Sequence, residues 1–369
     1  MKKFCLITVT DGATVSSMSF NEIFLYRMDH RKGEKEILIS CRPIPQSLKT
    51  MCNSKVELYE LGFSPVKIRL ALQAIRKHCK EQGENFVVHM HFPRSAVITL
   101  LATIGTGVWK HTLFTEHSTF SGYRLHNKVL SFLCALMAER VTCVSEASFR
   151  AYPSLIRRLK KERMTGIPNG ADLERIDKEI GGTASMKATD GTVWFAYVAN
   201  IRPLKNHGFL LEVLRELPPH IHLLFVGVED SERTVSRQAE RMGLAERVKF
   251  TGLVPRDEVF KTVLGADVYT SPSTVEGIGI ATLEAMYCGL PAVLSDIPPH
   301  REIARGTDCI SVLPLEKDAW VREIGRYAAM SGEERERLGR QCRRHVEQNF
   351  SLERMHRAYD EIYAELARN

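Results

Sequence analysis

The 369-residue sequence lacks the features that would place it in several specialised classes of protein. Its apolar runs are short, and none approaches the roughly 18–20 residues that a membrane-spanning helix needs. The nine cysteines include no Cys-x-x-Cys pair, so their spacing indicates neither a disulfide framework nor a zinc site. Basic residues are present without an aromatic platform or a recognised nucleic-acid module. We therefore expect a protein without membrane spans, in a reducing cytoplasm, that does not bind nucleic acid.

The composition is typical of a globular protein, but the charged residues are unevenly distributed along the chain. Hydrophobic residues make up 44% and charged residues 26%, and the length suits two domains of roughly 150–200 residues. Residues 1–170 contain 25 Lys and Arg against 13 Asp and Glu (+12), whereas residues 171–369 contain 26 against 31 (−5). A basic half attracts polyanions or an anionic membrane surface, although an incidental bias of a solvated surface gives the same counts.

Short β-rich runs alternate with longer helical patterns, which is typical of βαβ units and parallel sheets. Two series of about six strands predict an α/β protein with two Rossmann-like domains, and the turn-forming triplet Pro168-Asn169-Gly170 marks the expected boundary. The expected strands are residues 4–10, 36–41, 56–61, 86–91, 111–115 and 140–144, then 193–198, 221–226, 247–251, 267–271, 292–295 and 310–313.

One turn between an expected strand and an expected helix combines glycines with carboxylates. Residues 276–284 read Glu-Gly-Ile-Gly-Ile-Ala-Thr-Leu-Glu. Gly277 and Gly279 leave backbone N–H groups bare, and together with the helix N-terminus these groups can hold an anion. Glu276 and Glu284 flank the turn and can accept hydrogen bonds from hydroxyl groups. Such a site suits a nucleotide-sugar, although an ordinary tight βα connection is the alternative.

A second loop carries two cations directly after the strand expected at residues 193–198. Ligands of parallel α/β sheets bind at the carboxyl ends of the strands, where Arg202 and Lys205 would project. Two cations at this spacing suit a diphosphate whose negative charge grows as it leaves. The alternative is a pair of exposed surface cations.

These motifs, with two others in order, resemble the signature of family 4 glycosyltransferases, and the resemblance covers nearly the whole chain. It implies the GT-B fold, in which two Rossmann-like domains face one another across a cleft. Residues 1–168 would then form the acceptor domain, onto which a C-terminal helix at residues 351–369 packs back, and residues 169–350 would form the nucleotide-sugar donor domain. The matching stretches are Glu276–Glu284, Asn200-Ile201-Arg202-Pro203-Leu204-Lys205-Asn206, Ile167-Pro168-Asn169-Gly170-Ala171-Asp172 and Thr115-Glu116-His117.

The resemblance also assigns roles to individual residues. Arg202 and Lys205 would contact the diphosphate, and Glu276 and His117 would position the donor sugar; these four are the expected catalytic residues. Glu284 would hold the ribose hydroxyls, although a carboxylate stabilised by the helix macrodipole is an alternative. The remaining expected donor-binding residues are Gly277, Ile278, Gly279, Ile280, Asn200 and Gly12.

The sequence leaves the roles of residues in three further segments open. The family's glycine-rich loop after the first strand is reduced here to Gly12 in the run Asp11–Thr14, which puts its role in doubt. His89 and His91 share one face of a strand, where a polar core role competes with ligand contact, above all for His89. His300 lies in a segment that resembles another family stretch near the donor, or that simply begins a helix after two prolines.

The family resemblance implies a retaining transfer without a protein nucleophile, and the absence of Asp-x-Asp agrees with transfer that is independent of a metal ion. No cofactor is expected, because the nucleotide-sugar is a substrate; a UDP-sugar is the first candidate and a GDP-sugar the second. The acceptor would be a glycan or a polyprenyl-diphosphate-linked glycan of bacterial surface polysaccharide synthesis. The alternatives are a nucleotide-sugar epimerase or hydrolase of the same architecture and a non-catalytic binding protein.

The expected location is the cytoplasm, with peripheral attachment to the inner face of the plasma membrane as an option. Residues 155–164 read Leu-Ile-Arg-Arg-Leu-Lys-Lys-Glu-Arg-Met, and as a helix they could lie on an anionic membrane with Leu155, Ile156 and Leu159 inward. A solvated charged face is the alternative.

Overall fold

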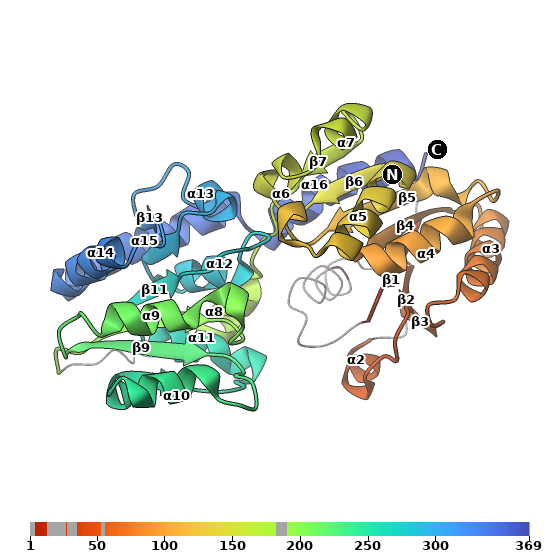
Figure 1. Cartoon of the computed structure of the whole chain (residues 1–369). Helices are drawn as coiled ribbons and strands as arrows, with labels where there is room; N and C mark the ends of the chain where they lie inside the picture. Colours follow the sequence, from red (N-terminus) through yellow and green to blue (C-terminus); the bar gives the residue numbers. More distant parts are fainter. Residues whose placement is uncertain (1–3, 13–26, 28–34, 53–55, 182–189, 369) are drawn as a thin grey trace. The chain divides into compact units, whose positions relative to one another are not determined.

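The computed structural model describes residues 4–12, 27, 35–52, 56–181 and 190–368. The chain divides into two compact units, of which unit 1 comprises residues 1–169 with 352–369, and unit 2 comprises residues 170–351. Each unit is built on one parallel sheet with helices on both faces (Figure 1). The predicted α/β class with two Rossmann-like sheets is therefore confirmed.

The sheet of unit 1 has seven parallel strands in the order β3-β2-β1-β4-β5-β6-β7. Its central strands are buried along their whole length, which explains why β1 reads Phe-Cys-Leu-Ile-Thr-Val-Thr rather than as an alternating pattern. The short strand β7 was not predicted from the sequence. The strands are β1 (Phe4–Thr10), β2 (Glu36–Ser40), β3 (Val56–Glu60), β4 (Asn85–His91), β5 (Thr112–Glu116), β6 (Arg140–Cys143) and β7 (Met164–Gly166).

The helices of unit 1 follow from local signals in the sequence. Ser64 caps α3 by accepting a hydrogen bond from the Lys67 amide, and Pro65 occupies its first position, where no amide is needed. The described helices are α2 (Gln46–Met51), α3 (Pro65–Glu81), α4 (Pro93–Thr103), α5 (Leu125–Met137), α6 (Glu146–Arg150) and α7 (Ser154–Leu159), with short 3-10 turns η1 (Val108–His111) and η2 (Phe120–Gly122).

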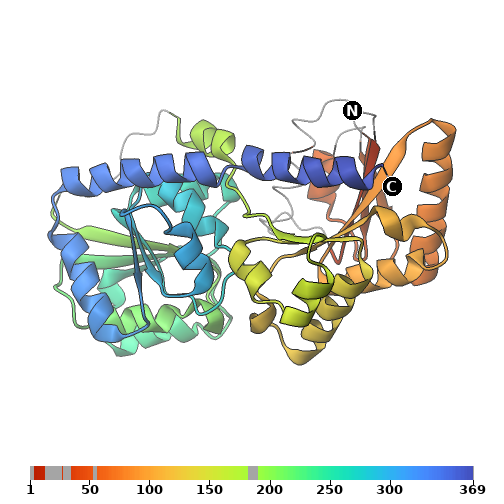
Figure 2. The same cartoon turned by 90° about the horizontal axis from the view of Figure 1, so that it is seen from above.

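The last helix of the chain, α16 (Leu352–Leu366), completes the core of unit 1 (Figure 2). Its apolar stripe packs on β1, β4 and β5. Arg27 is 1% exposed and reinforces this junction, because its guanidinium lies 2.9 Å from Glu36 on β2 and 3.4 Å from Asp360 on α16. The stripe consists of Leu352, Met355, Tyr359, Ile362, Tyr363 and Leu366.

Unit 2 has a six-stranded parallel sheet in the order β10-β9-β8-β11-β12-β13. Helix α15 packs closely on α12, and a Cβ atom at Gly339 would lie only 1.9 Å from the carbonyl oxygen of Gly289. The strands are β8 (Val193–Val198), β9 (Ile221–Val226), β10 (Val248–Phe250), β11 (Val268–Ser271), β12 (Ala292–Ser295) and β13 (Ile310–Leu313). The helices are α8 (Leu173–Ile180), α9 (His207–Leu214), α10 (Thr234–Arg241), α11 (Arg256–Leu264), α12 (Ile280–Tyr287), α13 (Pro298–Ile303), α14 (Lys317–Ala329) and α15 (Gly332–Asn349), with 3-10 turns η3 (Pro203–Lys205) and η4 (Ala245–Arg247).

Both sheets reverse their strand order at one place, between β1 and β4 in unit 1 and between β8 and β11 in unit 2. Loops diverge at such a reversal and leave a crevice beyond the carboxyl ends of the two strands, where open α/β sheets bind their ligands. The topology therefore defines one place to look in each unit.

Cys309 and Cys342 form a disulfide within unit 2, whereas cysteine spacing had indicated no disulfide framework. Among the helices that the structure describes, none combines the length and the hydropathy of a membrane span.

Candidate functional site

In unit 2 an ion pair joins the two loops at the strand-order reversal. The Lys205 ammonium, after β8, lies 2.5 Å from Glu276 Oε1, after β11, and both side chains are largely buried. Asn206 adopts a left-handed conformation with φ of 57°, which ends η3 and lets α9 begin directly afterwards. Arg202 lies on the same loop and is exposed. The structure thus brings three of the four expected catalytic residues to one edge of the sheet.

The hydroxyl groups of Ser273 and Tyr197 hold the ion pair and its loop in place. Ser273 donates a hydrogen bond of 2.7 Å to Glu276 Oε1, the oxygen that also contacts Lys205. The Tyr197 hydroxyl lies 2.7 Å from Ser273 Oγ and donates to the backbone carbonyl of Lys205 at 3.0 Å. Burial raises the pKa of Tyr197, so it remains a neutral donor. Sequence reasoning missed both Tyr197 and Ser273, because neither stands in a motif.

The glycine turn leads into α12 as expected. Gly279 is the N-cap residue of this helix with φ of 87°, a conformation that other residues rarely adopt. The first N–H groups of a helix have no carbonyl partner within the helix, so the amides that begin with Ile280 are suited to an anion. Ile278 is buried in the core, and the Gly277 backbone leads from Glu276 to this turn.

Glu284 lies further along α12 and is 3% exposed. Its place in the second turn keeps the carboxylate close to the N-terminal end of the helix, where the macrodipole favours a negative charge. The structure therefore permits both the ribose contact and the macrodipole interpretation of this residue.

His300 of α13 belongs to the same neighbourhood, although the sequence left its role open. Its ring is fully buried, and Nδ1 lies 2.9 Å from the Ser295 carbonyl oxygen. Burial lowers the pKa of His300, while the Glu276 charge acts in the opposite direction. Its Nε2 has no hydrogen-bond partner among the described residues and would lie 4.0 Å from a Cβ atom at Gly279. The neutral ring therefore faces the glycine turn with one nitrogen available.

Asn200 takes a structural position at the rim of this site. Its side-chain oxygen accepts a hydrogen bond of 3.1 Å from the Val228 amide and so ties the loop after β8 to the loop after β9. A Cβ atom at Gly227 would lie 2.2 Å from the Ala199 carbonyl oxygen, so only glycine fits there. The two loops are thus held against one another beside Arg202.

His117 lies in unit 1, at the carboxyl end of β5, and contacts His91 of β4. His91 Nδ1 lies 2.7 Å from His117 Nε2, and the His89 ring is tilted against His91 with 4.0 Å between ring centroids. Burial lowers the pKa of His117 to about 4 and the pKa of His91 well below its ordinary value. Both imidazoles are therefore neutral, and one of them donates its N–H to the bare nitrogen of the other. Phe92, with φ of 69°, stacks on His117.

The other members of this group are structural. His89 hydrogen-bonds to Tyr363 of α16 at 2.8 Å and to Thr115 at 2.6 Å, which supports the polar core role considered for it. Glu116 is fully buried, and the Tyr152 hydroxyl donates to it at 2.9 Å. In the Thr115-Glu116-His117 run, His117 directly follows the end of β5, and β5 adjoins β4, one of the two strands at the reversal.

Gly12 lies at the end of β1, and a Cβ atom there would contact the Arg42 side chain at 3.3 Å. The preceding Asp11 accepts a hydrogen bond of 2.8 Å from the Ser95 amide and thereby caps α4. Ala13 and Thr14, the rest of the expected loop, are outside the described residues. The expected site residues thus fall into two groups, with His117 and Gly12 in unit 1 and the others in unit 2.

The group in unit 2 has a definite chemical capacity. Lys205, Arg202 and the amides at the start of α12 supply positive potential, and Glu276 and Glu284 supply hydrogen-bond acceptors. Phosphate groups could bind the first set while hydroxyl groups bind the second. Such a combination suits a ligand that carries both.

Comparison with solved structures defines the class of fold. HepE from Anabaena, solved in complex with UDP and glucose, superposes with a TM-score of 0.76 at 16% identity, over 99% of this chain and 100% of that one. A glycosyltransferase from Rickettsia africae superposes with a TM-score of 0.78 at 19% identity, over the full length of both chains. The fold is therefore that of the GT-B glycosyltransferases.

Sequence comparison identifies the class of enzyme. Residues 185–345 match the family model of glycosyl transferases group 1. Glycosyltransferase EpsF of Bacillus subtilis is 26% identical over 278 residues, which cover 71% of each chain. Phosphatidyl-myo-inositol mannosyltransferase of Mycobacterium tuberculosis is 27% identical over 257 residues, or 63% of this chain and 61% of that one. The chain contains a group 1 glycosyltransferase domain and is a glycosyltransferase.

Proposed function

We propose that this enzyme transfers a sugar from a nucleotide-diphosphate sugar to a glycan or lipid-linked acceptor, with retention of configuration and without a metal ion. The observation that carries the proposal is the Lys205–Glu276 ion pair, which lies at the strand-order reversal of unit 2 beside the N-terminus of α12. The cation and the helix N-terminus there suit a diphosphate. The carboxylate suits the hydroxyl groups on either side of that diphosphate.

In the proposed reaction, Lys205 and Arg202 stabilise the negative charge that develops on the departing nucleoside diphosphate. This role is consistent with metal-independent transfer, because the two cations and the α12 amides act where a divalent ion would otherwise act. Glu284 holds the ribose hydroxyls, and Glu276 and His117 position the sugar. His117 is suited to this task because its imidazole is neutral and does not attract the diphosphate.

The donor base and the acceptor are proposed from the relatives. HepE was solved with UDP-glucose, which favours a UDP-sugar over a GDP-sugar. EpsF and a lipopolysaccharide outer core galactosyltransferase, WaaB, belong to the compared proteins, and these names favour bacterial surface polysaccharide synthesis. A polyprenyl-diphosphate-linked acceptor would place the enzyme at the inner face of the plasma membrane.

A thermal-shift screen with UDP, GDP and ADP tests the donor site. Ligand at about 100 times its dissociation constant stabilises by roughly 2.7 kcal/mol, so one nucleotide should raise the unfolding temperature clearly. We expect UDP to act, and Arg202→Ala/Lys205→Ala to lose the shift, whereas Arg237→Ala, an exposed cation on α10, should retain it. The proposal fails if no nucleotide shifts the wild type, or if the double variant responds fully.

Incubation with the matching nucleotide-sugar distinguishes the rival functions. An epimerase or hydrolase converts the donor when no acceptor is present, and a binding protein leaves it unchanged under all conditions. The transferase consumes the donor at an appreciable rate only with an acceptor, and proton NMR of the product then reports whether the anomeric configuration is retained.

A further inference from the structure

Helix α5 of unit 1 carries four of its long apolar side chains on the outside, while Phe132 and Met137 are partly buried against the core. Leu125, Val129, Leu133 and Leu136 are 78%, 50%, 38% and 38% exposed. Their spacing of four, four and three residues places them on one side of the helix. The fully buried positions of the helix hold the small residues Ser131, Cys134 and Ala135. A surface helix of a globular protein normally turns most of its long apolar side chains toward the core.

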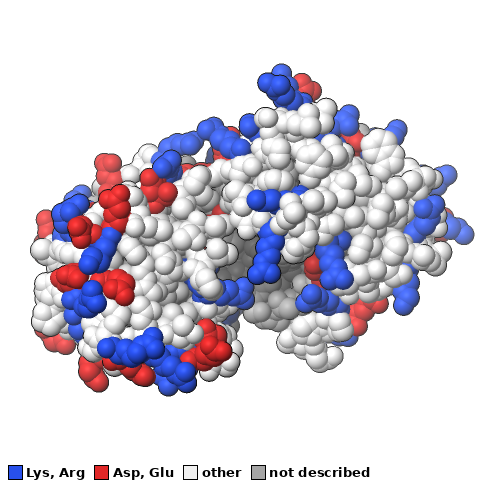
Figure 3. Space-filling model, viewed as in Figure 1, with Lys and Arg blue, Asp and Glu red and all other residues white. Residues whose placement is uncertain are grey.

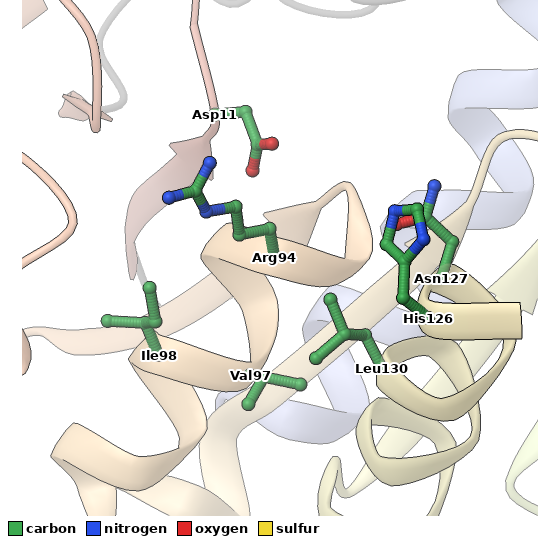
Figure 4. A pocket seen from close by; sticks show the side chains of 7 residues that line it. All are labelled: Asp11, Arg94, Val97, Ile98, His126, Asn127 and Leu130. Carbon is green, nitrogen blue, oxygen red and sulfur yellow. The ribbon is translucent and has the colours of Figure 1, made fainter. Parts of the chain in front are cut away.

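The neighbouring helix α4 extends this apolar surface. Leu101 is 47% exposed, and α4 packs against α5. A cavity of about 490 Å³ lies between the two helices (Figure 4). Its floor is formed by Val97, Ile98 and Leu130, while Arg94 and Asp11 lie at one end and His126 and Asn127 at the other. We refer to the outward sides of α4 and α5 as the α4–α5 face.

Helices α4 and α5 themselves carry cations and no carboxylate. Between residues 85 and 138 the sequence has one carboxylate, Glu116, and it is fully buried. Four cations lie in the same span, namely Arg94, Lys110, Arg124 and Lys128. Figure 3 shows the surface over α4 and α5 as largely uncharged, with Lys and Arg toward its margins. Asp11, in the cavity, is engaged with the Ser95 amide and lies toward Arg94 (Figure 4).

We propose that the α4–α5 face docks on an anionic lipid bilayer. Exposed aliphatic side chains can enter the boundary between headgroups and acyl chains, and flanking cations attract anionic headgroups. A protein partner would be indicated by aromatic anchors and a rim of mixed charge, and this face has aliphatic residues and one sign of charge. The absence of an exposed carboxylate on either helix removes the repulsion that headgroups would otherwise meet.

This surface differs from the basic stretch at residues 155–164 that the sequence indicated. Ile156 of α7 is fully buried, so it cannot contact lipid. Lys160 donates to the Ala138 carbonyl at 2.6 Å, and Arg163 lies 3.1 Å from Glu139. Leu155 and Leu159 are exposed and α7 contacts α5, so α7 adds to the edge of the α4–α5 face rather than forming the docking site itself.

Vesicle co-sedimentation of the whole chain tests the proposal. The vesicles are phosphatidylcholine alone and an equal mixture of phosphatidylcholine and phosphatidylglycerol, each at low and high salt. The face variant is Leu125→Ser/Val129→Ser/Leu133→Ser, and the matched control is Leu253→Ser/Leu315→Ser, two exposed leucines of unit 2. A charge variant, Arg124→Ser/Lys128→Ser, is compared with Arg158→Ser/Lys161→Ser on the α7 side.

Wild type and the unit 2 control should sediment with the anionic vesicles and lose recovery at high salt. The face variant should lose at least tenfold in apparent affinity, and the α4–α5 charge variant should lose more than the α7 variant. Equal recovery with phosphatidylcholine alone, or wild-type recovery of the face variant, overturns the proposal. So does light scattering that shows a wild-type dimer and a monomeric face variant, because a second copy would then cover the face.

The inference does not depend on the donor site. The nucleotide-induced thermal shift of the face variant should equal that of the wild type, which also establishes that the variant is folded. Failure of vesicle binding with an intact nucleotide shift would reject the docking face alone.

Discussion

The two strand-order reversals share one topology and differ in their chemistry. At the reversal of unit 2 a charged pair, Lys205 and Glu276, joins the two loops. At the reversal of unit 1 the corresponding edge carries His91 at the end of β4 and its partner His117 after the neighbouring β5, two imidazoles held neutral by desolvation. A parallel α/β sheet therefore fixes where a ligand can bind, and the side chains at the reversal decide whether that ligand is charged.

The largest expected effect concerns the buried charges of unit 1. Arg27→Met removes the counter-charge of the buried Glu36 and the link to Asp360 on α16, and breaking such a pair typically costs about 3–5 kcal/mol. Hydrogen exchange of α16 amides should accelerate accordingly, while amides of β8 in unit 2 keep their protection. Arg27→Met/Glu36→Gln should recover part of the loss. Unchanged α16 protection in the single variant would contradict the role assigned to Arg27.

The next effect concerns the charged residues at the strand-order reversal of unit 2. Lys205→Ala and Arg202→Ala each remove a charged hydrogen bond worth about 1.5–3 kcal/mol, or roughly 10- to 150-fold. If the contact strengthens as the diphosphate leaves, turnover falls as well as donor affinity. Lys205→Arg should retain more activity than Lys205→Ala. Wild-type turnover in both alanine variants would contradict the assignment of the diphosphate site to this loop.

The neutral histidines near the strand-order reversal of unit 1 predict that the stability of this unit decreases in acid. The pKa of His117 is about 4 in the folded chain, against about 6.5 when unfolded. The unfolded chain therefore binds more protons between these values, and stability falls as pH decreases from about 6.5 to 4. Each such histidine adds up to about 1.4 kcal/mol per pH unit to the slope. Hydrogen exchange of unit 1 at pH 7, 6 and 5 measures it, and His91→Gln should make the slope shallower. An unchanged slope would mean that these rings do not remain neutral.

The smallest expected effect is that of a chelator. If Arg202, Lys205 and the α12 N-terminus neutralise the leaving diphosphate, transfer in EDTA should proceed at nearly the untreated rate. A rate that disappears with EDTA and returns with Mn²⁺ or Mg²⁺ would show that unit 2 requires a divalent ion in addition to its cations.

Most of the fold was predictable because strands of covered parallel sheets are continuous apolar runs. The predicted ranges 4–10, 193–198, 221–226, 292–295 and 310–313 coincide with observed strands. The short strand β7, Met-Thr-Gly, carries too little periodicity to be recognised. The apolar residues of α5 recur at helical spacing, but this spacing does not tell which way they point, because periodicity identifies a face without saying what covers it.

The candidate site was predictable only where a motif marks it. Glu276, Lys205 and the glycine turn stand at recognisable spacings, and the structure brings them together. Tyr197, Ser273 and His300 come to the same place through the strand order, which no local pattern encodes. The pairing of His91 with His117 likewise requires that β4 and β5 be neighbours in the sheet.

The discontinuous make-up of unit 1 has a consequence for how the protein is made. The residues of α16 that fill its core, Tyr359 and Tyr363 among them, are translated after all of unit 2. Unit 2 is one continuous segment and can fold while the ribosome is still working, whereas the first-made unit must wait with part of its sheet uncovered. The unit that a ribosome makes first is therefore the one that finishes last, and a chaperone that acts on this chain would find its substrate there.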